Sequence, residues 1–138
     1  MTIHIDGGSR GNPGPAAAGI VITADDGTVI HEAGLFLGQA TNNVAEYSGL
    51  LGGLKAAGKL GAREVEVVSD SELLVRQMTG RYRVKNAGLQ PLYQEAQQLA
   101  RGFARCTYRH VRREENVDAD ALVNQALDSK RSVGDAAE

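Results

Sequence analysis

The feature that most limits the fold of this chain is a helical segment that carries four glycines. Between residues 44 and 60, apolar side chains recur at the spacing of a helix, yet the segment contains Gly49, Gly52, Gly53 and Gly58. Each glycine costs about 1 kcal/mol of helix propensity relative to alanine. Close packing must compensate, so we expect this helix to be central and buried against a sheet.

The segments around this helix predict an α/β fold. Apolar runs and alternation predict strands at residues 3–6, 18–23, 28–35, 64–69 and 106–111, and helices at 44–60, 71–78, 89–103 and 118–130. The glycine-rich residues 7–15 are expected to break regular structure. This order implies a five-stranded mixed sheet, with three antiparallel strands followed by parallel strands, flanked by about four helices.

Local signals mark several ends of these elements. Asp26 and Gly27 suit a hairpin turn. Asn43 and Glu46 have the spacing of a capping box at the start of the glycine-bearing helix, and the Asp70–Ser71 pair can cap the short helix that follows. Pro91 is tolerable in the first turn of the third helix.

Length and composition predict a single domain. At 138 residues and 42% hydrophobic content, the chain can bury roughly two-thirds of its unfolded surface. We expect the domain to span residues 1–130 and residues 131–138 to form a flexible tail. Cys106 is the one cysteine, so no internal disulfide can form. No stretch approaches the roughly 20 apolar residues of a membrane span, and we expect a soluble, cytoplasmic protein.

The charge balance does not favour a protein that binds a polyanion through a large overall positive charge. The net charge is −2 and the pI is near 5.9. Basic residues nevertheless gather at 81–85 and at 101–113, which permits local basic surface. A solvated charged face explains these clusters equally well.

Four acidic residues, Asp6, Glu46, Asp70 and Asp120, are the candidate functional group. Two would end neighbouring strands, and two would project from the first turns of helices toward the same edge of the sheet. Carboxylates gathered in this way repel one another unless cations neutralise them, and hard divalent cations prefer oxygen ligands. Each acid taken singly also has a structural explanation, as a cap, a helix-dipole partner or a turn initiator.

Four sequence blocks carry a family resemblance. Residues 6–15 (DGGSRGNPGP), 41–46 (TNNVAE), 69–71 (SDS) and 115–122 (ENVDADAL) resemble, in order, the signature blocks of type 1 ribonucleases H. The resemblance spans about residues 2–128. It implies the ribonuclease H fold and endonucleolytic cleavage of the RNA strand in RNA–DNA hybrids.

By this resemblance, Asp6, Glu46, Asp70 and Asp120 match the catalytic, metal-binding quartet of the family. Asp118 is a rival for the fourth position, although the register of the block favours Asp120. Two Mg²⁺ ions about 4 Å apart can serve both ends of an in-line phosphoryl displacement and give 5′-phosphate and 3′-hydroxyl products. Mn²⁺ should substitute for Mg²⁺, because it accepts the same oxygen ligands.

The resemblance also implies a set of substrate contacts. Short polar groups suited to the 2′-hydroxyls of the RNA strand are Gly8, Ser9, Asn12, Asn43, Ser71 and Glu72. Glu72 departs from the amide that is more common in relatives. Thr41 and Asn86 resemble a pair that binds a DNA phosphate, and Asn42 resembles a DNA-strand contact; helix capping is the alternative for Thr41. The expected partner is an RNA–DNA hybrid, with no membrane, and we expect a monomer.

Three departures from the family are visible. Only residues 80–88 separate two helices where many relatives insert a basic helix and loop. No tryptophan is present, so Tyr82 or Arg81 would replace a DNA-contacting indole. We expect His110 to belong to a strand rather than to a catalytic loop, which leaves Arg112, Arg113 and Glu114 as stand-ins.

Two other functions remain open at this point. One is a catalytically idle module that binds hybrids, against which the intact acidic quartet argues. The other is a different nuclease of the same superfold, such as a resolvase or transposase core, which would act on DNA.

Overall fold

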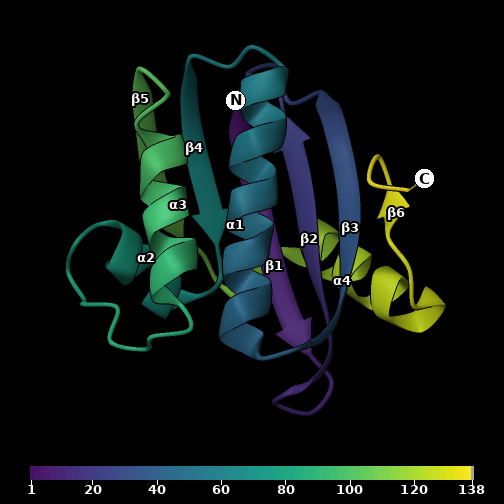
Figure 1. The fold of residues 1–138 in the computed structure, drawn as a ribbon. Helices are drawn as coiled ribbons and strands as arrows, with labels where there is room; N and C mark the ends of the chain where they lie inside the picture. Colours follow the sequence, from purple (N-terminus) through teal and green to yellow (C-terminus); the bar gives the residue numbers. More distant parts are fainter. Residues whose placement is uncertain (138) are drawn as a thin grey trace.

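A six-stranded mixed sheet with helices on both faces forms the fold (Figure 1), as described by a computed structural model for residues 1–137. The elements are β1 (Thr2–Ser9), β2 (Gly14–Thr23), β3 (Val29–Ala40), α1 (Asn42–Lys59), β4 (Glu64–Ser69), α2 (Glu72–Met78), α3 (Gln90–Ala100), β5 (Arg105–His110), the 3-10 turn η1 (Arg113–Glu115), α4 (Val117–Ser129) and β6 (Val133–Gly134). The predicted order of strands and helices up to α4 is confirmed. None of the helices in residues 1–137 is long and apolar enough to cross a membrane.

The strands lie in the order β5-β4-β1-β2-β3-β6. Strands β1, β2 and β3 pair antiparallel, whereas β1, β4 and β5 pair parallel. The predicted mixed sheet is therefore confirmed. Helices α1 and α3 cover one face of the sheet, and α4 covers the other (Figure 1).

The prediction of five strands was wrong by one. In the segment predicted as a flexible tail, Val133 and Gly134 pair antiparallel with Gly34 and Ala33, which makes β6 the outer strand beside β3. Two residues are too few to produce any periodic pattern, which is why sequence reasoning did not find this strand. The domain boundary at residue 130 stays a prediction, and position 138 of the predicted tail lies outside the described residues.

The glycine-bearing helix is central, as predicted, and three of its four glycines explain its position. A Cβ atom would lie 3.0 Å from the Asp6 carbonyl oxygen at Gly49, 2.7 Å from a methyl group of Ile20 at Gly52, and 2.6 Å from a methyl group of Ile3 at Gly53. Helix α1 therefore packs closer to the sheet than alanine would allow. Gly58 has open space around it, so the expectation of close packing was wrong there.

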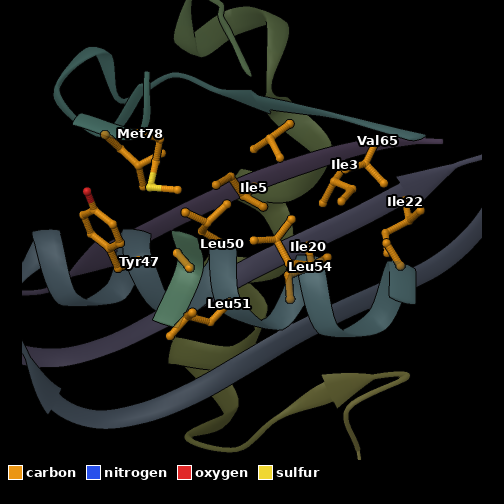
Figure 2. Packing of buried hydrophobic residues seen from close by; sticks show 14 of the residues in the cluster. Ile3, Ile5, Ile20, Ile22, Tyr47, Leu50, Leu51, Leu54, Val65 and Met78 are labelled. Carbon is orange, nitrogen blue, oxygen red and sulfur yellow. The ribbon is translucent and has the colours of Figure 1, made fainter. Parts of the chain in front are cut away.

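The main core fills the space between α1 and the sheet (Figure 2). Leu50 and Leu54 of α1 pack with Ile3 and Ile5 of β1 and with Ile20 and Ile22 of β2, all of them buried. Tyr47 is also buried, and its hydroxyl donates a hydrogen bond of 2.7 Å to Oε1 of Gln77. This buried bond joins α1 to α2.

Strands β1 and β2 extend further than the sequence indicated. Gly7 and Gly8 pair with Ala18 and Ala17, so the predicted break at residues 7–15 shrinks to residues 10–13. The reason lies in packing: a Cβ on Gly7 would lie 2.4 Å from the backbone of Ala45. The glycine here admits α1 to the sheet rather than ending the strand.

The capping prediction for α1 was wrong by two residues. Thr41, not Asn43, is the N-cap, and its hydroxyl accepts a hydrogen bond of 3.2 Å from the Val44 N–H. The predicted cap of α2 is confirmed, because Ser71 accepts a hydrogen bond of 3.2 Å from the Leu74 N–H. Pro91 lies in the first turn of α3, as predicted.

Candidate active site

A pocket of about 550 Å³ opens where β1 and β4 end and where α1 and α4 begin. In Figure 1 the ends of both strands and the first turn of α1 lie at the lower edge of the sheet. Asp6, Glu46, Asp70 and Asp120 all line this pocket. The structure thus brings together four acids that are widely separated in the sequence.

The parallel pairing of β1 and β4 places the first two acids side by side. Ile5 pairs with Ser69, the last residue of β4, so Asp6 in β1 and Asp70 just after β4 are the next residues along the two chains. Ser69 is buried, and its hydroxyl accepts a hydrogen bond of 3.0 Å from the Ser71 N–H. This bond fixes the turn that carries Asp70 out of the sheet.

Glu46 comes from the first turns of α1, on the opposite side of the pocket from α4. Burial raises the pKa of its carboxyl group, a hydrogen bond from Ser71 opposes that rise, and the charge of Asp70 adds to it. Ser71, which was predicted as an RNA contact, therefore also supports Glu46.

Asp120 is positioned by the anchoring of α4 on the sheet. Asn116, just before α4, is buried and donates a hydrogen bond of 2.8 Å from Nδ2 to the Ile5 carbonyl. A Cβ on Gly19 would lie 2.1 Å from the Ala119 carbonyl oxygen, so the glycine allows the helix to touch β2. Asp118, the rival candidate, lines a separate small pocket with His4.

The electrostatics of the pocket centre on Asp6. Burial and then the charge of Asp70 are the main causes that raise the pKa of Asp6 to about 8. A hydrogen bond from the Gly7 N–H opposes the rise, and a hydrogen bond and charge from Asp120 add smaller contributions to it. The Asp6 carboxyl group therefore ionises less readily than an ordinary aspartate. Because the ionised carboxylates of this pocket repel one another, a cation that binds among them is stabilised by their charge.

The donor set fits a hard divalent cation, although the ligands are not gathered into a finished site. Within residues 1–137, no three His, Cys, Asp or Glu side chains stand as a ready-made coordination group. The pocket nevertheless offers carboxylate oxygens from four different elements, which is the ligand chemistry of Mg²⁺ and Mn²⁺. The pKa of Asp6 is raised first by burial and then by the neighbouring charge of Asp70, and a bound cation would oppose both effects.

The loop between β1 and β2 is tied to the start of α1. The Ser9 N–H donates to Oδ1 of Asn42 at 2.8 Å, and the Asn42 N–H donates to Oδ1 of Asn12 at 3.0 Å. The Ser9 hydroxyl donates to the Ala40 carbonyl at 2.8 Å. Hydrogen bonds thus link three predicted substrate contacts, Ser9, Asn12 and Asn42. The side-chain oxygens of both asparagines already accept a hydrogen bond within the protein. Gly8, Ser9 and Asn42 also line the acidic pocket.

The other predicted contacts lie outside the lining of that pocket. Asn43 is exposed in the first turn of α1, and Glu72 is paired with Arg76 at 2.7 Å on α2. Asn86 is exposed between α2 and α3, where its Oδ1 accepts a hydrogen bond of 2.7 Å from the Gly88 N–H. The hydrogen bonds of residues 1–137 include none between Asn86 and Thr41, the other half of the predicted phosphate pair.

The pocket also contains residues that sequence reasoning did not select. Arg10, Val123, Asn124 and Leu127 line it, as does Arg113, which was named only as one of three stand-ins for a histidine. Helical spacing is the signal that was available for α4, since Val123, Asn124 and Leu127 lie three, four and seven residues after Asp120. Nδ2 of Asn124 donates to the Asp120 carbonyl at 3.2 Å.

The predicted departures from the family can be located in the structure. Only residues 79–89 join α2 to α3, and they form no further helix, so the inserted helix of many relatives is absent from this connection. The Arg76 guanidinium lies 5.2 Å from the ring centroid of Tyr82, which is 49% exposed. His110 ends β5, as predicted, and lines a pocket beside α2 rather than the acidic one.

Comparisons with known proteins agree with this arrangement. A family model described as reverse transcriptase-like matches residues 4–126. The chain is 53% identical to the bifunctional protein Rv2228c of Mycobacterium tuberculosis over 94% of its own length, and 43% identical to a protein of Halobacterium salinarum named ribonuclease HI over 91% of its own length. It spans 36% of the mycobacterial protein and 63% of the halobacterial one.

Solved structures give the same result. The crystal structure of RNase H1 from Halobacterium salinarum superposes with a TM-score of 0.90 at 42% identity, covering 93% of this chain and 97% of the other. The crystal structure of LC11-RNase H1 in complex with an RNA/DNA hybrid superposes with a TM-score of 0.89 at 42% identity, covering 94% and 97%. With its strand order, its pocket of four carboxylates and these relatives, the chain belongs to the type 1 ribonuclease H family.

Proposed function

We propose that this chain cleaves the RNA strand of RNA–DNA hybrids by metal-dependent hydrolysis, leaving 5′-phosphate and 3′-hydroxyl ends. The observation that carries the proposal is the convergence of Asp6, Glu46, Asp70 and Asp120 on one pocket. It is supported by relatives named ribonuclease HI and RNase H1, one of which was solved with an RNA/DNA hybrid.

Asp6, Glu46, Asp70 and Asp120 are the residues that would hold two Mg²⁺ ions, with Mn²⁺ as a substitute. When bound, such ions supply a water of lowered pKa and stabilise the leaving oxygen. Asp6 lies beside the end of β4, which carries Asp70, and shares a hydrogen bond with Asp120, so it would act together with both in holding metal. Its raised pKa means that it must give up its proton when cations bind.

The surroundings of the pocket are suited to orient a hybrid. The amide oxygens of Asn12 and Asn42 accept backbone hydrogen bonds, which turns each side chain's NH₂ group into its free donor. The donor on Asn12 suits the 2′-hydroxyl and base-edge acceptors of RNA, and we propose that Asn42 directs its donor to the DNA strand. We also propose RNA-strand contacts for Gly8, Ser9, Asn43, Ser71 and Glu72, and a DNA-phosphate role for Thr41 and Asn86.

No histidine lines the pocket within the described part of the chain. Of the three residues named as replacements for the family's loop histidine, Arg113 is the one that lines it. We propose that Arg113 takes part in the release of the 5′-phosphate product by charge rather than by proton transfer, because a guanidinium stays protonated at all working pH values. We also propose that the protein acts as a monomer and in the cytoplasm, where hybrids arise.

A cleavage assay with matched substrates tests the function. One labelled strand sequence is presented as RNA–DNA hybrid, duplex DNA and duplex RNA, each with Mg²⁺, with Mn²⁺ or with a chelator. We expect cleavage of the hybrid alone, in the RNA strand, with either metal and not with the chelator. Binding of the hybrid without cleavage would indicate a non-catalytic module, and cleavage of duplex DNA would indicate another nuclease of the same fold.

A further inference from the structure

The pocket needs positive charge of its own to admit a nucleic acid strand. Its lining carries four carboxylates and two cationic side chains, Arg10 and Arg113. Bound cations would offset the acids around the bond that is cleaved, but the neighbouring phosphates of the same strand lie beyond those ions. Protein cations commonly neutralise such phosphates.

Arg10 is held in place at both its backbone and its side chain. Its N–H donates a hydrogen bond of 2.8 Å to the Pro15 carbonyl across the loop. Its Nη2 donates to Oδ1 of Asp128 at 2.7 Å, although the two residues are 118 positions apart. Asp128 lies in the last turn of α4. The arginine is thereby fixed against the last turn of α4, the helix whose first turn carries Asp120.

This ion pair is suited to orientation rather than to stability. The side chains are 50% and 70% exposed, and pairs of this kind contribute little to folding free energy. Asp128 lies eight positions after Asp120, so the helix holds them about 12 Å apart along its axis. Asp128 therefore keeps the guanidinium away from the metal-binding acids, whose negative charge would otherwise attract it. Because a guanidinium carries five N–H donors, several remain for a second partner.

We propose that Arg10 binds a phosphate of the RNA strand beside the bond that is cleaved, and that Asp128 is the residue that positions Arg10. The inference rests on the proposed function. The RNA strand is the one addressed, because the strand that enters the acidic pocket must continue along its wall. Val123 and Leu127 of α4 form the part of that wall between Asp120 and Arg10. A guanidinium can hold a phosphate with two parallel hydrogen bonds.

The first test removes the charge. In Arg10→Ala we expect KM for hybrid to rise about tenfold with kcat nearly unchanged, since a hydrogen-bonded charge pair in the substrate complex is lost. The slope of log KM against log salt should fall by about 1. Arg101→Ala is the control, because Arg101 is exposed at the end of α3 and does not line the pocket. An unchanged KM and salt slope in Arg10→Ala would overturn the inference.

The second test assigns the strand. Single phosphates flanking the cleavage site are replaced by neutral methylphosphonates, either in the RNA strand or in the DNA strand. We expect one RNA-strand replacement to raise KM for the wild type about as much as Arg10→Ala does, and to have little further effect in that variant. If only a DNA-strand replacement behaves in this way, the assignment to RNA is wrong.

The third test concerns Asp128. Removing a negative charge near a polyanion would by itself lower KM, whereas loss of positioning raises it. We expect Asp128→Ala to raise KM about threefold, and to add nothing when combined with Arg10→Ala. A lower KM in Asp128→Ala would overturn the positioning role.

Failure of the inference is separable from failure of the proposed function. If the wild type cleaves hybrid and Arg10→Ala has the same KM, the inference alone fails. If the wild type does not cleave, the proposed function fails, and fluorescence anisotropy of labelled hybrid in Ca²⁺ then compares the variants. Equal affinity of wild type and Arg10→Ala would overturn the inference in that case as well.

Discussion

The side-chain amide of Asn116 donates a hydrogen bond of 2.8 Å to the backbone carbonyl of Ile5, one residue before Asp6. This bond joins the start of α4 to the central strand. It therefore sets the distance between Asp120 on the helix and Asp6 on the strand. Both groups are buried, so the bond cannot be replaced by water without a rearrangement.

Asn116→Ala should destabilise the fold and disturb the site together. The variant loses the buried hydrogen bond to the Ile5 carbonyl, at a cost of about 1–3 kcal/mol. We expect chemical denaturation to show this loss of stability. We also expect cleavage to need a higher Mg²⁺ concentration, because the distance between Asp6 and Asp120 is no longer fixed. Gln125→Ala, at an exposed position of the same helix, should change stability by no more than about 0.5 kcal/mol. Equal stability of the two variants would argue against the anchoring role.

Asp6 should make the metal-free protein less stable as pH rises. The pKa of Asp6 is about 8 in the folded chain, against an ordinary value of 3.8 that applies when unfolded. Its stabilising contribution is therefore complete below pH 3.8 and is lost as pH rises toward 8. The Tm of the wild type in a chelator should fall, relative to that of Asp6→Asn, between these limits. A constant difference between the two Tm values across this range would contradict the raised pKa.

Asp70→Asn should separate activity from stability. The amide cannot replace a metal-binding carboxylate, so hybrid cleavage should be abolished. Relief of the repulsion with Asp6 and Glu46 should raise the metal-free Tm by about 3 °C if it amounts to about 1 kcal/mol. Circular dichroism and thermal melts beside the cleavage assay check both effects. Wild-type turnover by this variant would remove Asp70 from the mechanism.

Two glycines of α1 should respond to alanine in opposite directions. Gly53→Ala places a Cβ 2.6 Å from a methyl group of Ile3, and such overpacking costs about 1–3 kcal/mol. Gly58→Ala meets open space and should stabilise the helix by up to about 1 kcal/mol. Urea denaturation of both variants gives the comparison. Stabilisation by both substitutions would show that helix propensity, not close packing, dominates at these positions.

Asn86→Ala should weaken hybrid binding more than it slows saturated turnover. Asn86 lies outside the acidic pocket, on the loop before α3, so it can position DNA without touching the reacting atoms. Binding is measured in Ca²⁺ and turnover at saturating hybrid in Mg²⁺. Gln98→Ala serves as control, because it removes an exposed side-chain amide that lies on α3. Equal binding by wild type and Asn86→Ala would refute the phosphate-pocket assignment.

The parts of the fold that follow from local pattern were predictable. The glycine spacing of α1 indicated close packing, and the order of the elements gave the mixed sheet. The proximity of Asp6 and Asp70 could be predicted from the order of the elements, which suggested that β1 and β4 are parallel neighbours.

What could not be predicted depends on contacts between distant residues. Glycines at positions 7 and 8 read as a loop, because the approach of Ala45 that requires Gly7 is visible only in three dimensions. Arg10 gave no signal either, since its partner Asp128 lies at the other end of the chain. The missing sixth strand is similar, because two residues carry no period of their own.

Strand β6 has a consequence for any shortened version of this chain. Together with Ser132 and Asp135, it covers the outer edge of β3. The Phe36 N–H donates to the Ser132 hydroxyl at 3.1 Å, and the Glu32 N–H donates to the Asp135 carboxylate at 2.8 Å. Cutting the chain after Lys130 would keep every acid of the pocket but leave an open sheet border. Such a border recruits strands from other molecules. The truncated chain would keep its pocket but be lost progressively to aggregation.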